Sequence, residues 1–196
     1  MNRREFITLL GGAAAAWPRA VRAQQPALPV IGFLSSTSRQ VFASRLGVFA
    51  QGLKAEGYVD GQNVAIEYRF AEDEENRLPA LAVELAQQRL TVFVAGGSPS
   101  TVAAQAAAGT VPIVFETAGD PVSLGFVTSL IKPGGNLTGV SNLNSEVGPK
   151  RLELVRELLP AATIVAVLVN PSAPTITNEY MRRLEAAAAE IGRAHV

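Results

Sequence analysis

Cysteine is absent from the 196-residue chain, and histidine occurs once, as His195 next to the C-terminal residue. Without a thiol the chain forms no disulfide, thiolate nucleophile, iron–sulfur cluster or zinc–cysteine site. Without an internal histidine the fold holds no Ser–His couple and no histidine-based metal site or general base. These absences exclude much of enzyme chemistry, so the sequence predicts no cofactor and no metal.

Charge of one sign is also lacking, since 17 Lys and Arg residues offset 17 Asp and Glu residues. Four arginines and one glutamate lie in the first 25 residues, and the remainder of the chain is mildly acidic. Recognition of nucleic acid needs clustered Lys and Arg, so no nucleic-acid partner is expected. A hydrophobic fraction of 48% with 17% charged residues is typical of a globular domain.

Nucleotide-binding motifs are missing too, because the chain contains neither Gly-x-Gly-x-x-Gly nor Gly-x-x-x-x-Gly-Lys-Ser/Thr. The run Gly96-Gly97-Ser98-Pro99-Ser100 is not a Gly-x-Ser-x-Gly nucleophile elbow. After the first 25 residues no apolar run approaches the roughly 18 residues of a membrane span. We therefore expect no stable membrane insertion once the N-terminal segment is removed.

The N-terminus has the pattern of an export signal, which we assign to residues 1–23. A basic start with Arg3-Arg4 precedes the apolar stretch from Phe6 to Trp17, and Val21-Arg22-Ala23 is a small-x-small cleavage pattern. The paired arginines resemble a twin-arginine signal, which predicts a periplasmic protein. The alternative is an amphipathic N-terminal helix that stays on the protein.

Short apolar runs alternate with amphipathic segments from residue 28 to residue 143. The runs predict strands at 28–34, 64–70, 90–95, 111–115 and 138–143. The segments between them predict helices over 42–53, from the acidic run 72–75 onward, over 101–108 and over 122–131. Strands that alternate with helices pair in parallel through right-handed crossovers. The expected fold of residues 28–143 is a five-stranded, parallel, Rossmann-like α/β lobe with helices on both faces.

Residues 144–190 show only the start of a second such unit. A helix is predicted over 149–159, a sixth apolar strand at 164–169 and a helix over 175–189. One strand between two helices does not close a core, so we expect an incomplete second α/β lobe. The last residues, 191–196, match one reading frame of a widely used sequencing adapter. We expect this tail to be foreign, the alternative being a natural helix cap at Gly192.

Small polar residues follow most of the predicted strands. Ligands of parallel sheets bind beyond the carboxyl ends of the strands, where glycines admit a ligand and helix N-termini offer N–H groups to an anion. The residues expected to bind a ligand are Ser35, Ser36, Gly97, Ser98, Ser100, Thr117, Asp120, Asn142 and Asn170. Each Ser, Thr or Asp that precedes a helix is equally a candidate N-cap, and Asp120-Pro121 is a good one.

Two carboxylates at this edge leave alternatives open. Asp120 or Glu116 is placed to hold a ligand ammonium group, while Glu116 is also suited to a hydrogen bond with the next turn. The two together are an acid and base pair on residue type alone, which gives an exported enzyme as the alternative function. A ligand-sensing receptor ectodomain is a further alternative.

The ordered motifs of the chain resemble one known family. They are Arg3-Arg4-Glu5-Phe6, Val30-Ile31-Gly32-Phe33-Leu34, Gly57-Tyr58-x-x-Gly61-Gln62-Asn63-Val64, Val111-Pro112-Ile113-Val114-Phe115, Gly119-Asp120-Pro121-Val122, Lys132 to Ser141, Lys150 to Leu154 and Leu158-Leu159-Pro160. Over residues 28–190 they resemble the solute-binding proteins of bacterial ABC transporters, specifically the family that includes aromatic amino-acid binders.

The resemblance implies a periplasmic-binding-protein type I-like fold, in which two α/β lobes are joined by a hinge and hold a solute between them. It implies a non-catalytic protein whose partners are a small-molecule solute and a cognate ABC permease. Ser35, Ser36, Gly97 to Ser100, Thr117 with Asp120, and Asn142 would contact the solute from the first lobe, and Asn170 from the second. Family members are about 300 residues long, so most of the second lobe is expected to be missing here.

Overall fold

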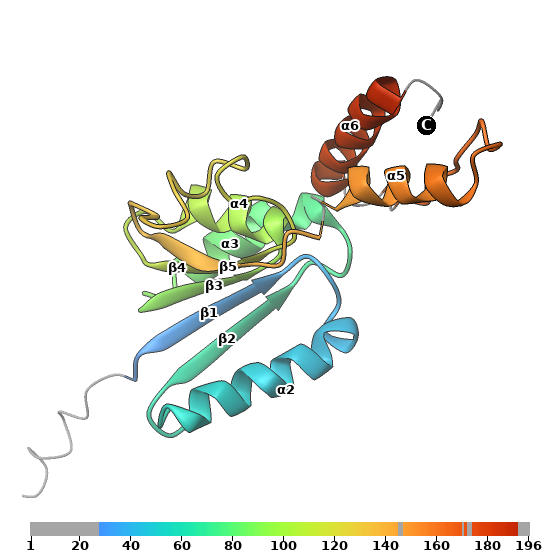
Figure 1. Cartoon of the computed structure of the whole chain (residues 1–196). Helices are drawn as coiled ribbons and strands as arrows, with labels where there is room; N and C mark the ends of the chain where they lie inside the picture. Colours follow the sequence, from blue (N-terminus) through green and yellow to red (C-terminus); the bar gives the residue numbers. More distant parts are fainter. Residues whose placement is uncertain (1–27, 145–146, 170, 172–173, 192–196) are drawn as a thin grey trace, which may run out of the picture.

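The structure is a computed structural model that describes residues 28–144, 147–169, 171 and 174–191. The predicted signal at 1–23, the candidate ligand residue Asn170 and all but the first residue of the predicted foreign tail lie outside these described residues. The described chain contains one sheet and the helices that pack on it, followed by two further helices (Figure 1).

The sheet has five strands that all run parallel, in the order β2-β1-β3-β4-β5. The strands are β1 Val30–Ser35, β2 Ala65–Phe70, β3 Val92–Gly96, β4 Ile113–Thr117 and β5 Leu137–Ser141. The predicted five-stranded parallel α/β fold is therefore confirmed, with strand bounds shifted by a few residues. Parallel pairing brings every carboxyl strand end to the same edge of the sheet.

Helices lie on both faces of the sheet. Helix α2, Arg39–Ala55, begins at Ser38, whose hydroxyl accepts the Val41 N–H at 3.3 Å. It covers β1 from one face, where the ring centroids of Phe33 and Phe42 lie 5.5 Å apart. On the other face α3, Leu78–Ala86, and α4, Ser98–Ala107, lie side by side (Figure 1).

The main core fills the space between the sheet and the α3–α4 layer. Its members are buried apolar side chains of the central strands and of these two helices, among them Leu34, Leu85, Phe93, Ala104 and Ile113. The edge strand β5 approaches its neighbour so closely that a Cβ on Gly139 would overlap the backbone oxygen and the ring of Phe115. Glycine at position 139 thus allows β5 to pair with β4.

Two predicted helix positions in this lobe are wrong. The helix predicted from the acidic run 72–75 onward is formed but starts later, because Glu72 and Asp73 have φ of 55° and 64°, in the left-handed region. The chain instead enters the short 3-10 helix η2, Glu75–Arg77, which leads into α3. Residues 122–131 form a series of turns rather than a helix. Gly125 adopts φ of 71° there, so the backbone cannot continue as a helix.

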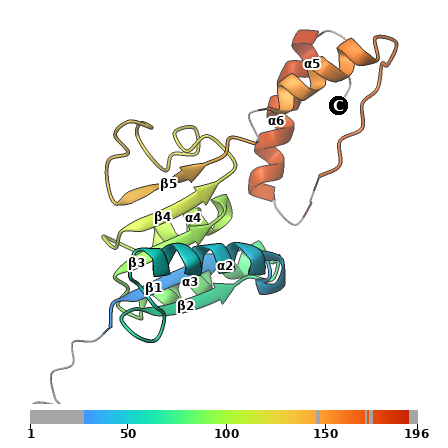
Figure 2. The ribbon, with the colours of Figure 1, turned by 60° about the horizontal axis from the view of Figure 1, so that its bottom comes forward.

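The C-terminal part contains α5, Gly148–Leu158, and α6, Pro174–Ile191, which pack against each other around Leu152, Leu184 and Ala188. The predicted sixth strand at 164–169 is not formed. An extended apolar segment needs a neighbouring strand for its backbone hydrogen bonds, and Leu168 is fully exposed. In Figure 2 α5 and α6 stand apart from the sheet. The division into lobes at residues 143 and 144 stays a prediction.

Candidate functional site

The carboxyl ends of four neighbouring strands form a polar edge, which we call the strand-end rim. The registers place Ser35 opposite Gly96, Gly96 opposite Glu116, and Thr117 opposite Ser141. The segments just beyond these pairs carry most of the residues that the sequence singled out. The structure therefore brings the predicted site residues of β1, β3, β4 and β5 together in one row.

A hydrogen-bonded network centred on Thr117 joins the β3, β4 and β5 ends of the rim. The hydroxyls of Thr117 and Ser98 are 2.6 Å apart, and both residues are at least 97% buried. The Thr117 hydroxyl also accepts the Gly119 N–H at 3.2 Å. The Thr117 carbonyl accepts the Asn142 N–H at 3.1 Å. This network fixes the start of α4 against the end of β4.

Helix α4 begins at the rim without a side-chain cap. Its N-cap is Gly97, with φ of 104°, a backbone conformation that residues other than glycine rarely adopt. The N–H groups of Ser98 and Ser100 fall in the first turn, where no carbonyl of the same helix reaches them, and Pro99 has no N–H. Such a helix start is suited to an anion, since its N–H groups and the helix dipole both favour negative charge.

Two hydroxyls complete this helix start. Ser36 Oγ lies 3.7 Å from the point where a Cβ on Gly97 would stand. Ser100 is fully buried, and within the described part of the chain its Oγ has no hydrogen-bond partner. Buried hydroxyls are normally paired, so a buried serine that lacks a partner in the first turn of α4 is an unusual feature of this edge.

The other predicted residues differ in how they stand at the rim. Ser35 is buried, and its hydroxyl accepts the Thr37 N–H at 3.3 Å, so it stabilises the turn after β1. Asn142 is exposed, and its side-chain oxygen accepts the Asn144 N–H at 3.2 Å. The half-buried Ser36 and Gly97 and the exposed Asn142 thus face solvent, while Ser35, Ser98, Ser100 and Thr117 shape the rim from beneath.

Asp120 holds its own loop. Its carboxylate accepts the Ser123 hydroxyl at 2.7 Å and the Val122 N–H at 3.0 Å. The Ser123 hydroxyl and then the Val122 N–H lower the pKa of this carboxyl below its usual value. Asp120 therefore caps a turn rather than the helix that the sequence predicted after it, and its two oxygens already have donors.

Glu116 does not pair with Asp120. Glu116 and Val114 alternate along β4 with the buried Phe115, so both point to the face of the sheet that carries α2. There the nearest cation is that of Arg45, at 3.9 Å. Asp120 instead follows the strand end and bonds within its loop. The arrangement gives no support to the alternative in which these two carboxylates act as acid and base.

Sequence reasoning missed two members of the rim. Gly119 donates to Thr117 and its carbonyl accepts the Ser141 hydroxyl at 2.7 Å, which ties the β4 loop to the end of β5. Both residues stand inside motifs that the sequence singled out, but the predicted strand at 138–143 placed Ser141 inside the strand rather than at its end, where it lies in β5. The pairing of β4 with β5 places Ser141 opposite Thr117, and this brings its hydroxyl to the Gly119 carbonyl two residues further on.

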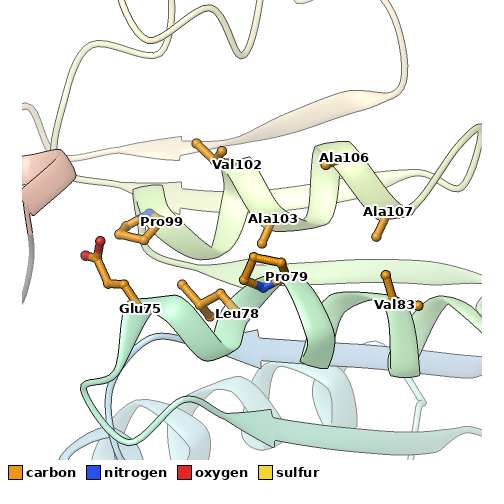
Figure 3. A pocket seen from close by; sticks show the side chains of 9 residues that line it. All are labelled: Glu75, Leu78, Pro79, Val83, Pro99, Val102, Ala103, Ala106 and Ala107. Atoms are coloured by element: carbon orange, nitrogen blue, oxygen red, sulfur yellow. The ribbon is translucent and has the colours of Figure 1, made fainter.

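A hollow lies in the groove between α3 and α4 (Figure 3). This cavity of about 310 Å³ is lined by Leu78, Pro79, Val83, Pro99, Val102, three alanines of α4 and Glu75. Its walls are apolar apart from Glu75, so they offer few groups to orient a polar solute.

Among the described residues no cluster of three Asp, Glu or His side chains is placed to hold a metal ion. None of the described helices is long and apolar enough to span a membrane.

Comparison with known proteins gives a consistent picture. A family model described as ABC transporter substrate binding protein matches residues 28–193. A curated tyrosine-binding protein of Clostridioides difficile (strain R20291) is 36% identical over 124 residues, which are 63% of this chain and 35% of that protein.

Solved structures agree with this match. A conserved domain protein of Vibrio cholerae superposes with a TM-score of 0.71 at 28% identity, over 86% of this chain and 56% of that one. An ABC domain of Streptococcus pneumoniae in complex with L-Trp gives 0.69 at 24% identity over the same shares. The chain thus spans little more than half the length of these two structures, and about a third of the curated relative.

Proposed function

Since the chain belongs to the ABC transporter substrate-binding protein family, we propose that it binds a small, amino-acid-like solute without transforming it. Residues 28–193 carry the family match. In this proposal the chain supplies the first of two lobes, and the strand-end rim is its solute-binding surface. The whole protein would be exported to the periplasm, with residues 1–23 as its signal, and would deliver the solute to a cognate ABC permease.

The start of α4 is the observation that carries the proposal. Gly97 gives the first turn no side-chain cap, and the N–H groups of the buried Ser98 and Ser100 have no acceptor within the helix. A solute carboxylate placed there receives these N–H groups and lies beside the hydroxyl of Ser36. No side-chain cap occupies this position, and the half-buried Gly97 and Ser36 are the residues through which a ligand would reach it.

The tyrosine-binding relative supports an amino acid as the first solute to test. A free carboxylate is the part of an amino acid that suits a helix N-terminus. Asp120 is occupied by its own loop, so in this proposal it does not hold the solute ammonium group. That group is left to Asn142, to rim carbonyls or to the second lobe, which also sets the choice of solute side chain.

The test follows rim amides by NMR while a solute is titrated into the isotope-labelled chain at millimolar concentration. At these concentrations NMR detects a Kd of about 1 mM, which corresponds to a binding free energy of only ~4 kcal/mol. Even the weak binding expected of a single lobe is therefore measurable. Tyrosine and 3-(4-hydroxyphenyl)propionate should shift the amides of Ser98 and Ser100. Tyramine, which lacks the carboxylate, should not.

Variants make the test specific. Ser36→Asp adds a carboxylate beside Gly97 and should weaken tyrosine binding at least tenfold, because like charges repel. Ser44→Asp makes the same change on an exposed position of α2 and should leave binding unchanged. The proposal fails if no rim amide moves with any of the carboxylates, or if tyramine and tyrosine give the same shifts.

A further inference from the structure

The outer surface of helices α3 and α4 is apolar although it faces solvent. We call the hollow between the two helices the α3–α4 groove. Figure 3 shows how its lining is ordered, from Glu75 and Pro99 at one end to Val83 and Ala107 at the other. Among the described residues that line the groove, Glu75 is the only one with a charge. An apolar patch of this kind on a protein surface is typical of an interaction site.

The groove combines projecting and recessed apolar side chains. Val83 of α3 is 49% exposed and Val102 of α4 is 50% exposed, so about half of each side chain projects into solvent. Ala103 and Ala107, which line the groove with them, contribute only methyl groups. An interface between two identical copies with twofold symmetry needs one patch that holds both a projection and the hollow that receives it. The α3–α4 groove meets this requirement.

Charges at the two ends of α3 indicate how two copies would face each other. The acidic run 72–75 precedes the helix, and the exposed Arg89 follows it three residues after Ala86, where the helix ends. A parallel arrangement of two α3 helices would place the two acidic runs against each other, and like charges repel. A twofold axis across the helix makes the two α3 helices antiparallel. The acidic run of each copy then comes close to Arg89 of the other copy, which is an attractive arrangement.

We propose that the α3–α4 groove is a contact surface between two copies of this chain, which pair with twofold symmetry and with antiparallel α3 helices. Val83 and Val102 of each copy would pack into the groove of the other copy. Residue 82 lies midway between Glu75 and Arg89, so its exposed neighbour Val83 would lie nearest the twofold axis.

The size of this surface sets the affinity to expect. Helices α3 and α4 contain 9 and 10 residues, so each is about 15 Å long, and two adjacent helices are about 20 Å wide. The face therefore covers roughly 300 Å² per copy, whereas a stable interface buries about 800 Å² per partner. A face of this size predicts weak pairing, with a Kd of roughly 0.1–1 mM.

This inference goes beyond the proposed solute binding and does not depend on it. Pro99 lines the groove and also stands in the first turn of α4, between Ser98 and Ser100. The two proposals nevertheless have separate readouts, since solute binding is followed at rim amides and pairing is followed by the mass of the chain without solute. A chain that binds tyrosine but stays a monomer would refute the pairing alone.

The first test is sedimentation velocity of the chain from about 0.02 to 2 mM, a range that brackets the expected Kd. The mean mass should rise with concentration toward that of a dimer. Val102→Asp should raise the Kd at least tenfold, because the new carboxylate loses water in an apolar contact. Val41→Asp is the matched control, since Val41 is exposed on α2 and lies outside the groove; its Kd should equal that of the parent.

These three proteins have the same terminal segments, so association through the termini would be equal in all of them. Val102 and Val41 are both exposed, and the variants should therefore retain the far-ultraviolet circular dichroism of the parent.

The second test reverses the charges at the ends of α3. Arg89→Asp would face the acidic run of the other copy and should raise the Kd about fivefold, as expected for exposed charges. Aspartate suits this position because Arg89 has φ of 53°, which Asp tolerates better than most residues. Adding Glu74→Arg to the same chain restores an attractive pair and should return the Kd to within about twofold of the parental value.

The third test uses the absence of cysteine, because one introduced thiol per chain can be linked only to another copy. A short bismaleimide should link two copies of Val83→Cys, whose thiols lie near the twofold axis. Val41→Cys at the same concentration should remain unlinked. This measurement does not depend on whether Val102→Asp folds.

Four results would overturn the inference. One is a monomer mass at every concentration, and another is equal linking of Val83→Cys and Val41→Cys. The third is association that persists in Val102→Asp but is lost in Val114→Asp, which would assign the contact to the face of the sheet that carries α2. The fourth is failure of Glu74→Arg to rescue Arg89→Asp, which would exclude the antiparallel arrangement.

Discussion

Because Ser98 and Thr117 share a hydrogen bond, substitutions of the two residues should have non-additive effects on the stability of the protein. A double-mutant cycle measures that coupling. The two hydroxyls are 2.6 Å apart and nearly inaccessible to water. Ser98→Ala removes this bond but leaves the Thr117 hydroxyl buried, still accepting from Gly119. A buried hydrogen bond contributes about 0.5–1.5 kcal/mol, and an unpaired buried group costs about 1–3 kcal/mol.

We therefore expect Ser98→Ala to lower the free energy of unfolding by about 1–2 kcal/mol, which lowers the Tm by roughly 2–8 °C for a chain of this size. Thr117→Val replaces the hydroxyl with a methyl of similar shape and should cost about as much. The double variant should lose about 1 kcal/mol less than the sum, because neither hydroxyl is then left without its partner. Urea unfolding of the four proteins, followed by circular dichroism, gives these values.

A control cycle combines Thr117→Val with Ser38→Ala. Ser38 caps α2 through the Val41 N–H and shares no hydrogen bond with Thr117 among the described residues. Its loss should cost about 1 kcal/mol, and the two effects should add. The reasoning is refuted if the Ser98–Thr117 coupling is below about 0.5 kcal/mol, or if the control pair couples as strongly.

Three further predictions concern the core, the β5 edge and the Asp120 loop. Phe93→Ala should cost about 3–5 kcal/mol in urea unfolding, because the ring is fully buried; a loss under about 1 kcal/mol would contradict this. Gly139→Ala should cost about 1–3 kcal/mol and speed amide exchange in β5, because its Cβ would overlap Phe115; unchanged exchange would show that β5 adapts. Asp120 has a lowered folded pKa, so it stabilises the fold above its unfolded pKa and less as pH falls through the folded value. Ser123→Ala should raise the pKa of Asp120, as followed by NMR titration, and should reduce the loss of folding stability at acid pH. An unmoved pKa would exclude the Ser123 hydroxyl as its cause.

The strand pattern was predictable because parallel, buried strands leave a strong signal in the sequence. Continuous apolar runs such as Val111–Phe115 are typical of the strands of parallel sheets. The amphipathic segments between the runs predicted helical crossovers. The same reasoning failed at 164–169, where the run is equally apolar but has no partner strand in the described structure. Apolarity alone does not distinguish a paired strand from a segment whose neighbour is elsewhere.

The helix predicted at 122–131 failed for a local reason. Asp120 and Pro121 have the residue types of a helix start, but Asp120 bonds to Ser123 and Val122 in a turn. Gly125 then takes a left-handed conformation that a regular helix does not contain. The sequence signal for a helix start is also the signal for a turn, and only the residues that follow decide between them.

The location of the candidate site was predictable, but the exposure of its members was not. The rule that ligands bind beyond the strand ends placed Ser36, Gly97 and Thr117 at one edge. That Ser98 and Thr117 bury their hydroxyls against each other depends on the distance between β3 and β4, which one sequence does not record. The same holds for Glu116, whose side chain faces α2 rather than the rim because of its place in the alternation of β4.

The Ser100 hydroxyl, which has no hydrogen-bond partner among the described residues, has a consequence for the stability of the native state. A buried oxygen without a partner makes the native state less stable than it would be with a methyl group in its place, by about 1–3 kcal/mol. Selection for stability alone would favour alanine at that position. Serine at position 100 thus lowers the stability of the native state, and the packing of the core alone does not account for it.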